Sequence, residues 1–144
     1  MKSPQRTSGA TRIAPAIALC AALAHPLASL ACPATPAGAR TVESPRHVLH
    51  YRTSPASPAV GKPFAIDMIV CPKNPQAGIV GLDVDARMPE HRHGMNYRAT
   101  VKSQKDGHYR AEGLMFHMPG RWEFMFDVRD ASGTEHLTHD TTIR

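Results

Sequence analysis

Histidine and methionine gather in the stretch MPEHRHGMNY, residues 88–97. Imidazole binds copper in either oxidation state, and thioether sulfur is a soft ligand that favours Cu(I). If this loop is extended, His91 and His93 face the same way, and Gly94 lets the chain bend so that Met95 joins them. The spacing therefore predicts a metal site of His91, His93 and Met95, in competition with a polar turn that is merely rich in histidine.

A second His/Met pair, His117 and Met118, stands in the motif HMPG. If the intervening strands run up and down, this turn lies at the same end of the domain as the loop at 89–96. We expect His117 as a further ligand and Met88 or Met118 as supplementary ones. Thioethers persist in an oxidising compartment, where thiols become disulfides, so we predict copper rather than zinc. Zinc would favour carboxylate with histidine, and Glu90 could supply it.

The polar-turn interpretation has its own support. Met88 continues the inward-facing series of its strand, which is the pattern of a core residue. His91 and His93 flank Arg92, as in a solvated cap. The remaining histidines are scattered along the chain, and for each we predict a structural or surface role: His47, His50, His108, His136 and His139.

Residues 1–31 have the pattern of a secretory signal peptide. A basic start without acidic residues precedes an apolar run at 13–30, which ends in a small-x-small motif at 29–31. A membrane anchor is the alternative, but prolines interrupt the run and leave too little apolar length to span a bilayer. The pattern predicts a periplasmic or secreted protein, cleaved near Ala31.

Two of the three cysteines follow this leader. An even pair in an exported chain predicts a disulfide, here between Cys32 and Cys71, which would tie the N-terminal tail to the domain. The rival is a lipid anchor on Cys32 with Cys71 free, although Ser29 stands where lipoprotein signals usually carry a Leu-like residue. Only in that case would we expect association with the membrane.

Charge and motifs exclude some functions. The chain has 17 Lys+Arg and 12 Asp+Glu, and three of the basic residues lie in the leader, so the mature chain carries a net charge of +2. No basic block remains, and we predict no nucleic-acid interface. No nucleophile motif such as G-x-S-x-G is present. Asp83 and Asp85 share a strand face that we expect to be solvated, and we predict that the protein is not an enzyme.

The fold prediction rests on a hydrophobic period of two. Residues 32–46 are rich in Pro, Ala and Gly and predict a flexible tail, which leaves residues 47–144 as one domain. Alternation there predicts antiparallel strands with one apolar face, separated by turn motifs, and a bulge at Gly113. The expected strands are 47–53, 64–70, 80–88, 97–103, 107–116, 122–128 and 135–143. About seven short strands predict an immunoglobulin-like β-sandwich, with a small closed barrel as the alternative and Trp122 as the large core anchor.

Two segments carry a family resemblance. LDVDARMPEHRHGMNYRATV and DGHYRAEGLMFHMPGRWEFMFDV resemble the YtkA-like and FixH-like exported domains, in which an MP-x-H-x-HGM loop precedes a strand and a segment ending in MPG-x-W follows. The likeness covers about residues 62–130. It implies an immunoglobulin-like sandwich outside the cytoplasmic membrane, and FixH-like proteins are associated with copper supply to respiratory oxidases. We expect no transmembrane anchor of the FixH type, a departure that weakens an oxidase-assembly role.

The leading hypothesis is therefore a small periplasmic copper-binding protein, a chaperone or buffer whose partner is a copper-accepting protein of the envelope. One alternative is a non-metal interaction module that presents its loops or an edge strand to an envelope partner. Another is a copper redox enzyme, which would need an open coordination position and a substrate cleft.

Overall fold

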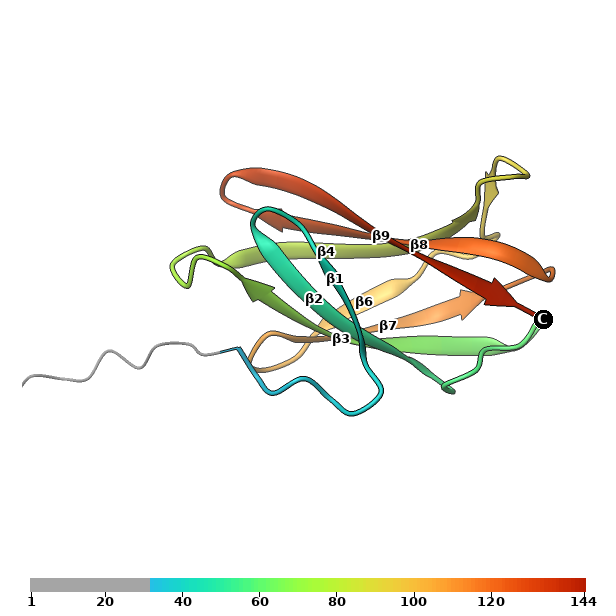
Figure 1. Cartoon of the computed structure of the whole chain (residues 1–144), viewed down its shortest axis with the longest axis horizontal. Helices are drawn as coiled ribbons and strands as arrows, with labels where there is room; N and C mark the ends of the chain where they lie inside the picture. Colours follow the sequence, from blue (N-terminus) through green and yellow to red (C-terminus); the bar gives the residue numbers. More distant parts are fainter. Residues whose placement is uncertain (1–31) are drawn as a thin grey trace, which may run out of the picture.

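The computed structural model describes residues 32–144, so the predicted signal peptide lies outside the described residues. These residues form two antiparallel sheets that face each other, as Figure 1 shows. One sheet has the order β1 (Arg40–Glu43), β2 (His47–Ser54), β3 (Pro63–Pro72), β7 (His108–Met115), β6 (Thr100–Ser103). The other has the order β5 (His93–Gly94), β4 (Ile79–Met88), β8 (Gly120–Asp130), β9 (Gly133–Ile143). The predicted all-β sandwich is confirmed.

The strand order is that of an immunoglobulin-like sandwich. Strands β2, β3, β7 and β6 have the order of A, B, E and D in such domains, while β4, β8 and β9 have the order of C, F and G. β1 is an additional edge strand beside β2, and β5 is a short edge strand beside β4. Within residues 32–144, no helix is long and apolar enough to cross a membrane.

Alternation along the strands places the apolar side chains between the sheets. In β8, Trp122, Phe124, Phe126 and Val128 are buried, and each buried side chain alternates with a more exposed one. Such a pattern gives each strand one face toward the core and one toward solvent. Trp122 is fully buried and is the largest side chain of the core, as predicted.

Two bulges adjust this pattern. In β7, two residues, Glu112 and Gly113, lie opposite a single residue of β3, and Gly113 has a φ of 84°. The predicted bulge is therefore present, and glycine suits its left-handed backbone. A second irregularity lies at Val80 in β4, where the alternation over 80–88 predicts an inward-facing residue but the side chain is 72% exposed. That prediction was wrong because the register shifts between Ile79 and Gly81, so Val80 leaves the alternating series.

The strand predicted over 97–103 begins only at Thr100. Tyr97 is 49% exposed, whereas Ala99 and Val101 pack partly buried against the core. The other predicted strands coincide with β2, β3, β4, β7, β8 and β9 to within three residues at each end.

The segment predicted as a flexible tail, residues 32–46, contains β1 and joins the first sheet. Arg40 to Glu43 pair with β2, so part of the tail is regular structure. Cys32 and Cys71 form a disulfide with Cα atoms 5.6 Å apart, as predicted. Cys71 lies at the end of β3 opposite to Pro63, which pairs with Met115 near the His117 turn. The disulfide and the histidine loop therefore occupy opposite ends of the sandwich.

His47 is the centre of a buried polar cluster near the disulfide end. Its side chain is fully buried; Nδ1 lies 2.8 Å from Oε2 of Glu135, and Nε2 lies 3.3 Å from Oδ2 of Asp130, without hydrogen-bond geometry. The Arg46 guanidinium donates to Asp130 at 3.0 Å, and the Ser44 hydroxyl donates to Glu135. We call these five residues the His47 cluster; it joins the start of β2 to the β8–β9 hairpin.

The His47 cluster is expected to make stability sensitive to acid. Burial alone raises the pKa of Asp130, but hydrogen bonds from the Ser132 amide and the Arg46 guanidinium outweigh it, and the pKa falls below its ordinary 3.8. Burial likewise opposes the lowering of the Glu135 pKa below 4.5, which hydrogen bonds beginning with that from Ser44 bring about. Because both pKa values are lower in the folded state, the stabilisation is present above about pH 4.5 and is lost as the pH falls through the folded-state values.

Urea unfolding followed between pH 7 and pH 3 measures this effect. We expect the free energy of unfolding to drop below pH 4.5, and the drop to be smaller in Asp130→Asn, which carries no titrating carboxylate at this position. Parent and variant curves that stay parallel over this range would contradict the assignment.

Candidate metal centre

A hairpin formed by β4 and β5 carries the predicted metal loop, and in Figure 1 it protrudes at the end of the sandwich where the chain terminates. Met88 pairs with His93 across it, and residues 89–92 form the connection. The His91 amide donates to the Met88 carbonyl at 3.2 Å, and Arg92 has a φ of 55°. The loop is thus a tight turn begun by its proline, and the extended conformation considered from the sequence does not occur.

The pairing of β5 with β4 determines where His93 points. Residues that pair directly across an antiparallel ladder project from the same face. Met88 is buried in the core, with 1% of its surface exposed, so its partner His93 also lies on the interior side and is half-buried. His91, on the turn itself, is exposed. The Met95 amide donates to the Ala86 carbonyl at 3.1 Å and keeps the chain against β4 beyond the two paired residues.

Three imidazole rings come together at this end of the sandwich. The ring centroids of His91 and His93 are 5.8 Å apart, and those of His93 and His117 are 5.0 Å apart. Trp122 lies beneath them, with its ring centroid 6.1 Å from that of His93 and 5.3 Å from that of His117. Its indole Nε1 donates to the Met118 carbonyl at 3.1 Å, which holds the turn that carries His117.

His117 carries a buried nitrogen with an unmet requirement. Its Nδ1 is buried and has no hydrogen-bond partner within residues 32–144. A buried polar atom without a partner is costly, and in native proteins it calls for a specific explanation, such as a bound ion or water. Metal coordination would satisfy this nitrogen.

The three methionines predicted as ligands differ in how accessible they are. Met95 and Met118 are partly buried and pack against the edge of the core. Met88 is enclosed, and its terminal methyl lies so close to Gly120 that a Cβ there would stand 2.7 Å from it. A thioether can coordinate a metal ion only where the ion can reach its sulfur, so Met95 and Met118 are better placed than Met88 to act as ligands.

Glu90, the carboxylate that would favour zinc, is engaged elsewhere. It accepts a hydrogen bond at 3.1 Å from Arg121, which also contacts Asp140 at 2.7 Å. The hydrogen bond with Glu90 makes the largest contribution to raising the pKa of the Arg121 guanidinium, followed by the negative charge of Asp140. The carboxylate thus lies in an exposed ion-pair network, and the histidines and methionines form the remaining donor set.

Most of the scattered histidines have structural partners. His136 is exposed and contacts Asp127 at 2.7 Å, and His139 accepts or donates a hydrogen bond with the Tyr51 hydroxyl at 2.8 Å. Burial lowers the pKa of His139 and raises that of Tyr51 to about 12. These contacts agree with the structural and surface roles predicted for them.

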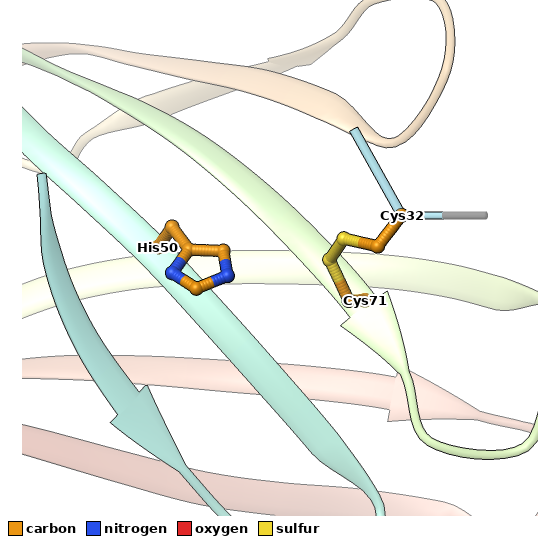
Figure 2. A group of neighbouring side chains, drawn as sticks. All are labelled: Cys32, His50 and Cys71. Atoms are coloured by element: carbon orange, nitrogen blue, oxygen red, sulfur yellow. A yellow bond between two sulfur atoms is a disulfide. The ribbon is translucent and has the colours of Figure 1, made fainter. Parts of the chain in front are cut away.

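His50 is different, and sequence reasoning missed it. Figure 2 shows its ring, on β2, beside the Cys32–Cys71 disulfide. Cys71 lies at the end of β3 that is opposite to the histidine loop. One ring nitrogen and the two sulfur atoms all lie within 4.8 Å of one another. Among residues 32–144, no other trio of His, Cys, Asp or Glu that could hold a metal ion is so close, and the group of His91, His93 and His117 is more widely spaced. The signal that finds it is the β2–β3 register, which a single sequence does not reveal.

Comparisons with known proteins add little to this geometry. No family model matches the chain, and no curated protein matches it. Among solved structures, a DUF4426 family protein from Pseudomonas aeruginosa PAO1 is similar, with 12% identity, a TM-score of 0.49, and coverage of 72% of this chain and 96% of that chain. A likeness at this level carries no argument about family or function. The protein is thus described by its fold, a β-rich sandwich domain, and the YtkA-like or FixH-like resemblance stays a prediction.

Proposed function

We propose that the protein is an exported copper-binding protein, a chaperone or buffer rather than an enzyme. The observation that carries this proposal is the group of three imidazoles at one end of the sandwich, in which the buried Nδ1 of His117 lacks a partner within residues 32–144. His93 and His117 are the central ligands, and His91 is an outer one on the exposed turn. Met95 or Met118 supplies the thioether, and Met88 supports the site from the core.

The donor chemistry supports copper. Imidazole and thioether together suit copper in its reduced state, while imidazole alone serves the oxidised state. The ligands stand on a hairpin and a turn at the tip of a rigid sandwich, and His91 is exposed. An ion held there is accessible from solvent, which suits transfer to a copper-accepting protein of the envelope. The YtkA-like and FixH-like resemblance points to the same general role in copper binding.

Export is part of the proposal. Disulfides persist mainly in oxidising compartments, so the Cys32–Cys71 bridge supports a periplasmic or secreted protein. The bridge also bears on lipidation, because a sulfur that is bonded to Cys71 cannot at the same time carry a lipid thioether. A protein without a lipid anchor is therefore the form that we propose.

Titration with copper tests the function. The oxidised protein is titrated with Cu(I) against a competing chelator, and with Cu(II) and Zn(II). We expect copper to bind in preference to zinc, and His93→Ala/His117→Ala to weaken Cu(I) binding by about 100-fold or more, since even second-shell changes cost 10–100-fold. Trp122 is the single tryptophan of the sequence, and its ring centroid lies 5.3 Å from that of His117. Its fluorescence therefore gives a second measure of metal occupancy.

His136→Ala is the matched control, because His136 is an exposed histidine paired with Asp127 on β8 and lies outside the three-ring group. It is expected to bind copper as the parent does. A parent protein that takes up no copper at micromolar concentrations would overturn the proposal, and the interaction-module alternative would then be tested with the same variants.

A further inference from the structure

The outer face of the β2–β3 pair brings His50 and Cys71 together. His50 pairs with Ile69, and Cys71 pairs with Val48, so these four residues project from the same face of the sheet. Their neighbours in the chain, Leu49 and Val70 among them, form the core on the other face. His50 and Cys71 are thus diagonal neighbours on a face that points away from the core.

The segment before β1 lies against this face. Cys32 is joined to Cys71, and Pro36 and Ala39 line a cavity of about 190 Å³ together with His50 and Ile69. Ile69 is only 2% exposed although it lies outside the main core, which shows that this face is covered. The disulfide therefore holds residues 32–39 over His50.

Two threonines orient the His50 ring. Nδ1 lies 2.8 Å from Oγ1 of Thr41 on β1, the partner of His50 in the ladder. Nε2 lies 3.3 Å from Oγ1 of Thr35, so this nitrogen faces the irregular segment that begins with Cys32. In metal-binding histidines, a hydrogen bond holds one ring nitrogen and the other nitrogen binds the ion. For His50, Thr41 would hold Nδ1 and Nε2 would be the ligand nitrogen.

We propose that reduction of the disulfide converts Cys32, Cys71 and His50 into a second metal site, for a thiophilic ion of the Zn(II) or Cu(I) class. Two thiolates and one imidazole are a ligand set that zinc sites use when they keep a fourth position open. Thiolate also selects Cu(I). The ligand atoms start within 4.8 Å of one another, and residues 32–39 carry one of them on an irregular segment that can adjust.

The conversion needs a two-electron reductant, and a dithiol supplies it. One thiolate of the dithiol attacks Sγ of Cys32, which is exposed, and the S–S bond breaks with Cys71 leaving as thiolate. The second thiolate of the dithiol then attacks the dithiol's own sulfur in the mixed disulfide. Cys32 is released as thiolate, and the reductant leaves as an intramolecular disulfide. The metal then binds both sulfurs and displaces the protons that they carry at neutral pH. Disulfide and metal exclude each other at this site.

The inference does not rest on the proposed function, because it uses no residue of the histidine loop. The protein is prepared in two forms, oxidised and reduced with a phosphine that is then removed without air. Zn(II) uptake is measured against a chromophoric chelator, and Co(II) serves as a probe for thiolate-to-metal charge transfer. The variants are Cys32→Ser/Cys71→Ser, His50→Gln and, as a matched exposed histidine, His136→Gln.

We expect reduction to add one equivalent of Zn(II) per chain and a thiolate charge-transfer band with Co(II), both absent from the double serine variant. His50→Gln should weaken the added zinc by about tenfold or more, and Thr41→Val by a similar factor through the ring orientation, whereas His136→Gln should not. In the reduced parent, zinc should also slow alkylation of both cysteines, a measurement that needs no variant.

No added zinc on reduction would overturn the site and would leave the disulfide as a tether of residues 32–39. Added zinc that His50→Gln does not weaken would overturn the three-ligand arrangement. Neither outcome touches copper binding by the oxidised protein, which tests the proposed function separately.

Discussion

Replacing Trp122 with alanine is expected to destabilise the protein by about 3–5 kcal/mol, the range for deleting a large buried aromatic side chain. Trp122 is fully buried and packs on Phe116 with ring centroids 4.9 Å apart. It also lies below His93 and His117, so the cavity would open directly beneath the candidate metal centre. For a domain of this size the melting temperature should fall by at least about 10 °C. Thermal and urea unfolding followed by circular dichroism measure the loss.

Trp122→Phe separates the packing of the indole from its hydrogen bond. Phenylalanine keeps most of the buried area but cannot donate to the Met118 carbonyl, and a lost hydrogen bond of this kind costs about 0.5–1.5 kcal/mol. The turn with His117 then loses its anchor, so we expect a smaller loss of stability together with weaker copper binding. Phe126→Leu is the control, because Phe126 is fully buried and packs on Tyr51, and its ring contacts do not include His91, His93 or His117. It should reduce stability without changing copper affinity.

Equal copper affinity in Trp122→Phe and the parent would contradict the view that the indole positions the metal turn. Weaker copper binding in Phe126→Leu would also contradict it, since the effect would then follow global stability rather than the local anchor.

The sandwich could be predicted from the sequence because its strands repeat every two residues and its turns are marked. The series at 122–128 is an example, because Trp122, Phe124, Phe126 and Val128 are buried and the residues between them are more exposed. The outward orientation of Val80 could not be predicted. A single extra residue in β4 reverses the face to which a side chain points, and no local residue type marks its position. Gly113 could, because a glycine at a phase slip is itself a signal.

The two ends of the molecule differ in how far sequence reasoning reached. Consecutive antiparallel strands place their turns at alternate ends, so the approach of His117 to the 89–96 loop followed from counting strands, and the rings of His93 and His117 do lie 5.0 Å apart. The His47 cluster joins residues 88 positions apart in the chain, and His50 meets Cys71 through the register of β2 on β3. Contacts of this kind depend on pairings that no local pattern encodes.

Removing the disulfide, by Cys32→Ser/Cys71→Ser, is expected to cost about 4 kcal/mol. The two cysteines are 39 positions apart, and closing a loop of that length removes this much conformational free energy from the unfolded chain. Urea unfolding of the parent, with and without a reductant, should show the same loss on reduction. The double serine variant should unfold identically in both conditions, which shows that the reductant acts only through this bond.

Metal should then distinguish the reduced parent from the serine variant. An ion that binds only the folded state at about 100 times its dissociation constant returns about 2.7 kcal/mol, which is most of the loss. We expect Zn(II) to stabilise the reduced parent by this order and His50→Gln less, because its site lacks the imidazole. The serine variant has no thiolates and should gain nothing at the tail. Equal stabilisation of the reduced parent and the serine variant would mean that zinc acts at another site, and the tail would then depend on the disulfide alone.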